Sequence, residues 1–226
     1  HARGACVLMD NTWATPLLFP PHERGVDIAI EAGTKYLSGS SDLLLGLTSA
    51  TAEWWPRLQR TFRQFAIPAG PEDMFLGLRG LRSMGLRLRE HERQGLAVAR
   101  WLEARPEITQ VRYPYLESHP QHALATAQQT AGGTVVAFTL DGPADPDGGK
   151  HRSFAFLDAL RLIDISNNLG DAKSLVTHPA TPTHMKTGYA GRQRVGISDT
   201  TVRLSVGLEH PDDALDDLER GLQARF

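Results

Sequence analysis

Short apolar runs, each followed by polar residues, organise the first part of the chain. Residues 5–9 and 26–30 are two such runs, and their continuity predicts buried strands of a parallel sheet. The connecting segment, residues 10–25, contains two prolines and a glycine, so any helix within it is predicted to be short. A third apolar run at residues 43–49 predicts another strand.

A helical period replaces this pattern further along the chain. Residues 52–65 are predicted to form one helix, and residues 72–105 one long helix or two in series. The apolar residues that are spaced to cover a core face of the second segment are Met74, Leu78, Leu81, Leu86, Leu88, Leu96 and Val98. We interpret the arginines on its other side as a solvated face.

After Pro106 the chain alternates between short strands and helices. The predicted strands are residues 108–113, 134–140 and 202–206, and the predicted helices are residues 121–129, 154–162 and 212–223. This alternation is typical of a smaller α/β domain, joined to the first part by the long helix. Gly, Pro and Asp residues at 141–150 predict an exposed loop.

Composition narrows the possible classes of protein. With 226 residues, 41% of them apolar, the chain can bury a sizeable core. A net charge of −2 gives no electrostatic reason to expect a nucleic-acid partner, and no run reaches the ~18 apolar residues of a membrane span. The only cysteine, Cys6, is interpreted as a small core residue. It cannot form a disulfide within the chain, so we expect a reducing, cytoplasmic location.

A carboxylate and an amine follow the first two apolar runs. Asp10 comes directly after one run, and Lys35 follows the other. Pyridoxal 5'-phosphate needs both, because its ring nitrogen takes a carboxylate partner and its aldehyde forms a Schiff base with a lysine. The pair therefore predicts this cofactor. Each residue alone has an ordinary alternative, since Asp10 could cap the next turn and Lys35 could be a surface residue.

Other polar residues point to a phosphate and to an amino-acid substrate. Thr34 can offer a hydroxyl and a backbone N–H to the cofactor phosphate. Arg203 lies in an otherwise apolar strand, where a planar carboxylate is its natural partner, and an amino acid carries one. A salt bridge to a protein acid is the alternative. Asn168, in a polar loop, could hydrogen-bond the same substrate carboxylate. The spacing of His178 and His184 matches no common metal site, so no metal is predicted.

Several longer segments together resemble the pyridoxal-phosphate enzymes of cysteine and methionine metabolism. This family includes cystathionine synthases and lyases, methionine gamma-lyase and the acylhomoserine sulfhydrylases. The segments that carry the resemblance are DNTWATPLLFPPHERGVDIAIEAGTKY (10–36), SDLLLG (41–46), LRGLRSMGLRL (78–88), NLGDAKSLVTHPATPTH (168–184) and GISDTTVRLSVGLEHPDDALDDLERGL (196–222).

The resemblance implies an α/β fold of the PLP-dependent transferase fold-type I. Residues 1–90 would be the C-terminal portion of the large cofactor-binding domain, and residues 91–226 the small C-terminal α/β domain. Members of this family are commonly tetramers, so a homo-oligomer built as a dimer of dimers is expected. The family usually has a long segment ahead of Asp10, and we expect this chain to be the C-terminal part of a longer protein.

Roles for particular residues also follow from the resemblance. It implies that Lys35 is the cofactor lysine, Asp10 the ring-nitrogen partner, Thr34 a phosphate ligand and Arg203 the anchor of the substrate carboxylate. The chain departs from the family pattern at Ala32, where a serine usually donates to the phosphate. Two further departures are Ser40, where the family often has histidine, and Asn168, where it has serine.

Three hypotheses for the function remain. Gamma-replacement or gamma-elimination on sulfur amino acids or O-acylhomoserine, through a Schiff base at Lys35, is favoured because residues 168–175 resemble the acylhomoserine sulfhydrylases. Cystathionine beta-lyase, which gives homocysteine, pyruvate and ammonia, is the alternative because residues 54–58 and 78–88 resemble bacterial beta-lyases. A third hypothesis, of another class, is a cofactor-free remnant that acts as an assembly or regulatory partner.

Overall fold

Two separate sheets make up the strand structure. The structure, a computed structural model, describes residues 1–66, 68–143 and 146–224. The first sheet has the order β1-β2-β3, with β1 at Leu8–Asp10, β2 at Ile28–Ala32 and β3 at Gly46–Ala50. The second has the order β4-β5-β8-β7-β6, with β4 at Ile108–Arg112, β5 at Val135–Leu140, β6 at Asp164–Ile165, β7 at Leu175–Thr177 and β8 at Thr201–Ser205.

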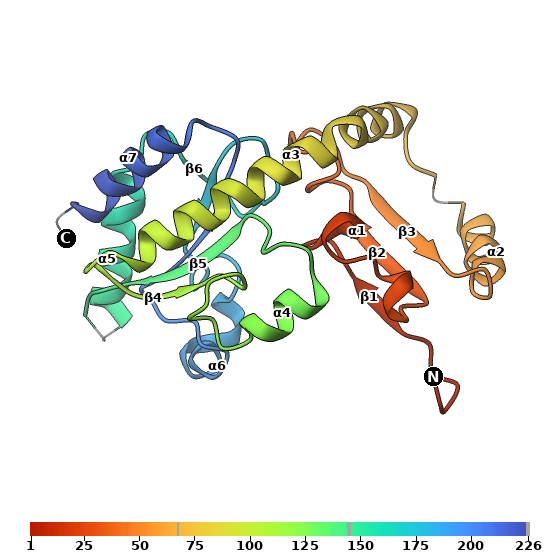
Figure 1. The fold of residues 1–226 in the computed structure, drawn as a ribbon, viewed down its shortest axis with the longest axis horizontal. Coiled ribbons are helices and arrows are strands. Elements are labelled where there is room, and N and C mark those ends of the chain that lie inside the picture. Colours follow the sequence, from red (N-terminus) through yellow and green to blue (C-terminus); the bar gives the residue numbers. More distant parts are fainter. Residues whose placement is uncertain (67, 144–145, 225–226) are drawn as a thin grey trace.

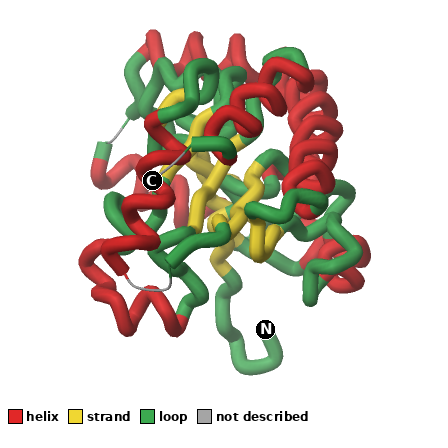
Figure 2. The backbone as a smooth tube through the Cα atoms, turned by 90° about the vertical axis from the view of Figure 1, so that its left-hand side faces the viewer, coloured by secondary structure: helices red, strands yellow, loops and turns green. Residues whose placement is uncertain are grey.

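Helices surround these sheets (Figure 2). In the described residues they are α1 (Thr15–Leu18), α2 (Trp55–Phe65), α3 (Pro71–Glu103), α4 (His122–Gln128), α5 (Pro146–Asp158), α6 (Gly188–Arg194) and α7 (Pro211–Leu222), with 3₁₀ turns at His22–Arg24 and Met185–Thr187. Helix α3 runs from the first sheet across the second, where it packs against β4, β5 and α7 (Figure 1). None of these helices is both long and apolar enough to cross a membrane.

Strands β1 and β2 pair in parallel, as predicted, and the register places Asp10 opposite Ile30. Strand β3 pairs antiparallel with β2. The predicted burial of the first strand is wrong, because 60% of Leu8 is exposed and Cys6 is only half-buried. Strand β1 lies at the edge of a three-stranded sheet, where it has a neighbour on one side only.

The main core lies between the second sheet and its helices. Alternation along β5 buries Val136, Phe138 and Leu140 completely, while Ala137 and Thr139 face the other side of the sheet. Buried side chains of α3, α5 and α7 complete this cluster. Each large apolar side chain buried there stabilises the fold by about 1.5–3 kcal/mol. The predicted α/β character of residues after Pro106 is confirmed.

The first half of α3 packs through glycines rather than leucines. Of the apolar residues expected to form the core face, Leu88 and Val98 are buried, but Met74, Leu78, Leu81 and Leu86 are exposed. The helix instead presents Gly80 to the segment after Lys35, so closely that a Cβ there would lie 2.3 Å from the oxygen of Leu37. A periodicity of large apolar residues does not detect this close backbone contact.

Two smaller predictions differ from the structure in their bounds. The helix expected at residues 52–65 forms as α2, which begins only at Trp55, and none of its residues is buried. The loop expected at residues 141–150 contains the start of α5, which begins at Pro146 with Asp147 in its first turn. Proline suits the first turn of a helix, and an acid there favours the helix dipole. Residues 144–145 of that loop lie outside the described residues.

Candidate functional site

The carboxyl end of β1 holds Asp10 in a charged state. The amide of Thr12 donates to Asp10 Oδ1 at 3.0 Å, and the Thr12 hydroxyl accepts from the amide of Ala32 at 2.8 Å. Hydrogen bonds from the hydroxyl and the amide of Thr12 lower the pKa of Asp10 below 3.8. Thr12 therefore ties the ends of β1 and β2 together and keeps a carboxylate at that edge. Thr12 was not predicted as a site residue, although its place two residues after an acid is a known turn signal.

Lys35 follows β2 in a tight turn. The turn is closed by the amide of Gly33, which donates to the oxygen of Leu45 at 2.6 Å, and by that of Ser38, which donates to the oxygen of Gly33 at 3.0 Å. The half-buried Lys35 side chain donates from Nζ to Oδ1 of Asn168. Partial burial and then the charge of Arg203 lower the pKa of Lys35, which favours the neutral, nucleophilic amine.

Thr34 lies in this turn, directly before Lys35, and its side chain reaches the segment that leads into β3. Its hydroxyl oxygen accepts from the amide of Leu45 at 3.4 Å, so its proton is left to be donated elsewhere. The side chain is half-buried next to Lys35. Thr34 is thus able to donate to an oxyanion beside the lysine.

Arg203 points from β8 towards the loop that carries Asn168. Its Nη2 donates to the main-chain oxygen of Asn167 at 2.7 Å and more weakly to that of Asn168 at 3.4 Å. Burial lowers the pKa of Arg203, and its Nε is buried without a partner in the described residues. It forms no ion pair with a carboxylate of those residues.

The Asn168 loop joins the lysine turn to the second sheet. Asn168 Nδ2 donates to Ser41 Oγ at 2.6 Å, and Ser41 in turn donates to Asp171. Gly170 has a φ of +74°, and a Cβ there would lie 2.8 Å from the nitrogen of Tyr36. Only glycine fits both the backbone conformation and this contact. The structure therefore brings Lys35, Asn168 and Arg203 together from distant parts of the chain.

Arg87 on α3 fixes the lysine turn from behind. It donates from Nη1 to the oxygen of Tyr36 at 2.8 Å and from Nη2 to those of Leu37 and Gly80 at 3.1 and 3.0 Å. The interpretation of the helix arginines as a solvated face is wrong for this residue. No signal in the sequence distinguishes it from its exposed neighbours, because its role depends on where α3 crosses the turn.

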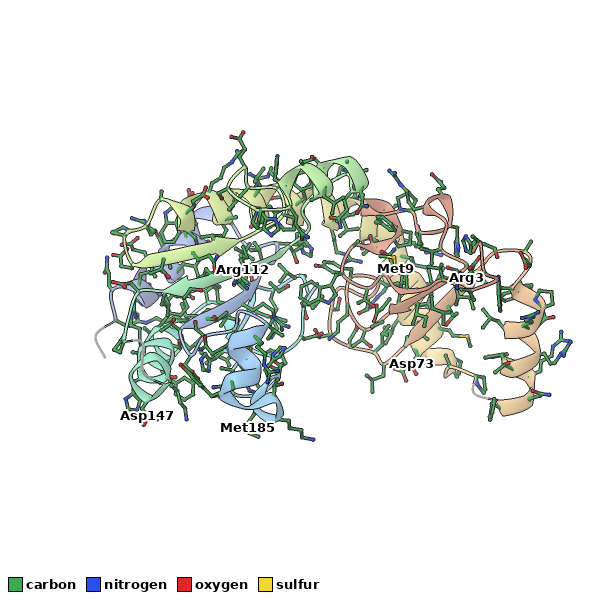
Figure 3. All side chains as sticks on the ribbon, turned by 90° about the horizontal axis from the view of Figure 1, so that it is seen from below. Arg3, Met9, Asp73, Arg112, Asp147 and Met185 are labelled. Carbon is green, nitrogen blue, oxygen red and sulfur yellow. The ribbon has the colours of Figure 1, made fainter. Side chains whose placement is uncertain are left out.

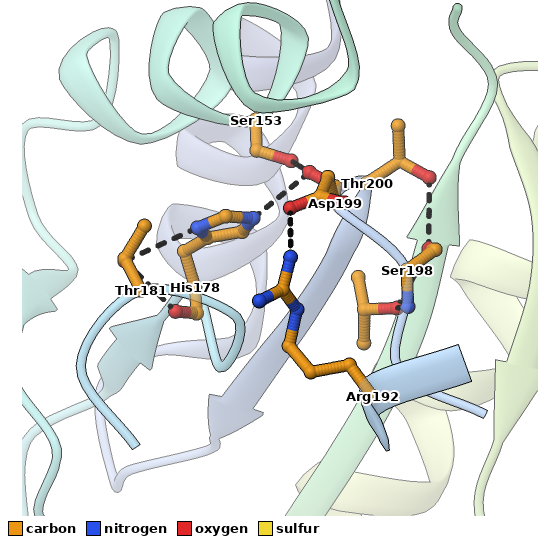
Figure 4. Close-up of polar contacts among 8 residues, drawn as sticks. Ser153, His178, Thr181, Arg192, Ser198, Asp199 and Thr200 are labelled. Carbon is orange, nitrogen blue, oxygen red and sulfur yellow. Dashed lines mark hydrogen bonds and ion pairs between the residues drawn. The ribbon is translucent and has the colours of Figure 1, made fainter. Parts of the chain in front are cut away.

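The two histidines of the 178–184 segment have different surroundings. His178 is buried, and its Nε2 lies 2.8 Å from the main-chain oxygen of Asp199, which also accepts from Ser153 (Figure 4). Arg192 forms a well-shielded ion pair with the Asp199 carboxylate at 2.9 Å. His178 thus ties the end of β7 to the start of β8, a structural role, and Arg192 holds α6 at the same point. His184 is half-buried.

Lys35, Asn168 and Arg203 lie together where the two sheets meet, and Asp10 lies at the carboxyl end of β1, beside the strand that precedes Lys35. A lysine amine of lowered pKa, an ionised carboxylate and an arginine are the groups that a ligand with an aldehyde, a cationic ring and a carboxylate would need.

Comparison with known proteins identifies the family. A model of the Cys/Met metabolism PLP-dependent enzymes matches residues 1–223. The chain belongs to this family. The cofactor of the family is pyridoxal phosphate, and the residues described above fit it: Lys35 would meet the aldehyde, Asp10 the ring nitrogen and Thr34 the phosphate.

Individual family members match nearly all of the chain. O-succinylhomoserine sulfhydrylase of Mycobacterium tuberculosis (strain ATCC 25618 / H37Rv) is 44% identical over 98% of this chain and 54% of its own length. A putative cystathionine beta-lyase of Rhizobium johnstonii is 41% identical over 99% of this chain and 55% of its own. The chain thus spans about half the length of these relatives.

Solved structures of the family confirm the predicted fold. Cystathionine gamma synthase of Xanthomonas oryzae pv. oryzae, in complex with aminoacrylate and cysteine, superposes with a TM-score of 0.90 at 38% identity. The match covers 97% of this chain and 55% of the synthase chain. The α/β fold and the prediction that this chain corresponds to the C-terminal part of the family fold are therefore correct.

Proposed function

We propose that the protein is a transsulfuration enzyme that acts on sulfur amino acids or O-acylhomoserine by gamma-replacement or gamma-elimination. The observation that carries this proposal is that the Lys35 amine donates to the Asn168 side chain, while Arg203 of β8 donates to the main chain of the same loop. Pyridoxal phosphate, when bound, supplies a ring that accepts electrons from the substrate Cα. The residues of this chain position the two partners and move protons.

Each residue has a specific task in this proposal. Lys35 holds the cofactor covalently and, once the substrate amine has taken its place, moves the proton at Cα. Asp10 keeps the ring nitrogen protonated, and Thr34 donates to the phosphate. Arg203 binds the substrate carboxylate through the N–H groups that the main chain leaves free, and Asn168 donates to the same carboxylate.

We propose that the enzyme carries out chemistry at Cγ of its substrate rather than beta-elimination. This proposal is supported by the 44% identity to an O-succinylhomoserine sulfhydrylase, while the 41% identity to a putative cystathionine beta-lyase supports the alternative. Both reactions begin with proton removal at Cα by the same lysine. They differ in whether the leaving group departs from Cβ or from Cγ.

We also propose that the protein acts as a homo-oligomer, a dimer of dimers, in the cytoplasm. An apolar strip on α3 supports oligomerisation, because Met74, Phe75, Leu78 and Leu81 are all exposed. The single cysteine supports a reducing compartment.

We place the boundary between a cofactor-domain portion, residues 1–90, and a small domain, residues 91–226, within α3. Light scattering on the intact protein measures its assembly.

Two experiments on the intact protein test cofactor binding first and substrate use second. The intact wild-type protein, supplied with pyridoxal phosphate, is expected to absorb near ~420 nm, and Lys35→Ala to lack this band. Absence of the band in the wild type would contradict an enzyme and favour the cofactor-free remnant. Homocysteine formed from O-acylhomoserine and sulfide supports chemistry at Cγ. Pyruvate and ammonia formed from cystathionine, without activity on the ester, support beta-lyase instead.

A further inference from the structure

Four side chains form a continuous chain of hydrogen bonds that ends at the Lys35 amine. Lys35 Nζ donates to Asn168 Oδ1, and Asn168 Nδ2 donates to Ser41 Oγ at 2.6 Å. Ser41 Oγ then donates to Oδ2 of Asp171, a buried residue. The chain of bonds crosses between the two parts of the molecule, one built on each sheet, which Figure 3 shows side by side. It therefore connects the lysine amine to a buried acid on the opposite part.

The donors and acceptors of this chain of bonds fit together in one direction. An ionised carboxylate can only accept, so Asp171 takes the single proton of the Ser41 hydroxyl. Ser41 Oγ is left to accept, and within the Asn168 amide only Nδ2 can donate to it. The amide oxygen of Asn168 therefore faces Lys35. A flipped amide would instead donate to the lone pair of the lysine, which is the electron pair that makes the amine a nucleophile and a base.

The backbone holds Asp171 and Ser41 in place for these contacts. The amide of Lys173 donates to Asp171 Oδ1 at 3.1 Å, and the amide of Ala172 donates to the oxygen of Gly39 at 2.9 Å. Ser41 has a φ of +53°, in the left-handed region that residues other than glycine rarely adopt and that persists where surrounding contacts determine it. The segment that carries the acid is thus tied to the segment that carries the hydroxyl.

We propose that Asp171 is a positioning residue for the amine of Lys35. Acting through Ser41, it keeps the oxygen of the Asn168 amide turned towards that amine. One N–H of Lys35 is then held while its lone pair stays free, and the second N–H of Asn168 Nδ2 remains for the substrate carboxylate. The inference rests on the proposed function for what the amine does, whereas the orientation of the amide depends on no reaction.

The titration of the Lys35 amine tests this orientation. Acetylation of the intact protein without bound cofactor, at a series of pH values and with mass spectrometry of the Lys35 peptide, gives the midpoint of that titration. Ser41→Ala breaks the chain of bonds but keeps the Asp171 charge, and it is expected to move the midpoint about one pH unit lower, because the ammonium form loses a carbonyl acceptor. Asp171→Asn, whose amide can donate to Ser41, is expected to have the same effect, and the double variant no more.

A control and two contrary results make this comparison decisive. Asp164→Asn removes an equal charge from an exposed acid that pairs with Lys173, and it is expected to keep the wild-type midpoint. Every variant leaves Arg203 in place, whose charge contributes with burial to the lowered pKa of Lys35. A lower midpoint in Asp171→Asn but not in Ser41→Ala would mean that the acid acts by its charge alone and would overturn the proposal. Wild-type midpoints in both variants would overturn it as well.

Turnover separates this inference from the proposed function. In the cofactor-loaded enzyme, the acidic limb of the kcat profile follows the free amine of Lys35, and it is expected to move to lower pH in Ser41→Ala and Asp171→Asn alike. Absence of turnover in the wild type, with the differences in acetylation intact, contradicts the proposed function alone. Equal acetylation midpoints in the wild type and in all variants contradict the positioning role alone, even where turnover is normal.

Discussion

Arg87 and Tyr36 are joined by a hydrogen bond of 2.8 Å from the guanidinium to the main-chain oxygen, directly after the proposed cofactor lysine. The same guanidinium donates to Leu37, so helix α3 holds two successive carbonyl groups of the lysine turn. A Cβ at Gly39 would lie 2.1 Å from Arg87 Nη1, so the glycine is part of the same contact. The position of Lys35 therefore depends on a residue far from it in the sequence.

Arg87→Gln is expected to lower the free energy of unfolding by about 2–4 kcal/mol, because half-buried carbonyl groups lose charged donors. Chemical denaturation of the intact protein measures this loss. Arg89→Gln, on the exposed side of the same helix, is the matched control and is expected to change stability by no more than about 0.5 kcal/mol. Similar losses for the two variants would show that Arg87 does not hold the turn.

Gly170→Ala is expected to lower the free energy of unfolding more than Gly188→Ala does. Both glycines have a positive φ, but only Gly170 is in close contact with another residue. At Gly170 the new Cβ adds a clash with Tyr36 to a positive φ, whereas at Gly188, with a φ of +68°, it meets nothing within 4 Å. Gly188→Ala should cost about 1–2 kcal/mol for backbone strain alone, and Gly170→Ala clearly more. Denaturation of both variants gives the comparison, and equal costs would refute the close contact with Tyr36.

The fold was predictable from the sequence where buried and exposed side chains alternate with a regular strand or helix period. Strand β5 alternates and its core residues follow that alternation, so the α/β character of the second part of the chain is evident from sequence. The first half of α3 was not predictable in the same way. Its contact uses Gly77 and Gly80, which carry no hydrophobic signal, and its leucines are left exposed.

The candidate site was predictable as a set of chemical groups but not as a network. A lysine, a strand arginine and a loop asparagine were assigned to one site from residue type and position, and Lys35, Arg203 and Asn168 do lie together. Their supports were not found, because the roles of Thr12 and Arg87 arise from contacts between separate elements. The type of a residue indicates which reaction it can take part in, whereas the residues that hold it in place are determined by contacts between distant elements.

Arg203→Lys is expected to raise the KM for the amino-acid substrate about 10–100-fold and to leave cofactor binding intact. Lysine keeps the charge but lacks the planar, two-pronged donor that matches a carboxylate. Steady-state kinetics measure the KM, and absorbance measures retained cofactor. An unchanged KM would remove Arg203 from the role of substrate anchor. Loss of cofactor in the variant would instead assign the residue to cofactor binding.

Thr12→Val is expected to raise the pKa of Asp10 towards its ordinary value. In the folded protein this pKa lies below 3.8, so the unfolded state binds the proton more readily. The stabilising contribution of Asp10 is therefore complete above about pH 4 and is lost as the pH falls through the folded pKa. Carbon NMR of the carboxyl group follows the titration. Thr12→Ser, which keeps the hydroxyl, should titrate like the wild type, and a wild-type pKa in Thr12→Val would contradict the assigned cause.

His91→Leu is expected to remove part of the acid sensitivity of the fold. Burial lowers the pKa of His91 to about 4, helped by the charge of Arg87 and opposed by those of Asp171 and Glu90. Because the unfolded histidine titrates near 6.5, it binds more protons than the folded one between these values. Its contribution to stability is complete above about pH 6.5 and falls by about 3 kcal/mol as the pH drops to about 4.

Neither ring nitrogen of His91 has a hydrogen-bond partner in the described residues, so an apolar replacement of similar size should cost little at pH 7. Denaturation of the wild type and of His91→Leu at a series of pH values from 4 to 7 measures the difference in slope. His151→Gln removes an exposed histidine and should keep the wild-type slope. The same slope in His91→Leu as in the wild type would mean that other buried groups, and not His91, bind the protons that destabilise the fold in acid.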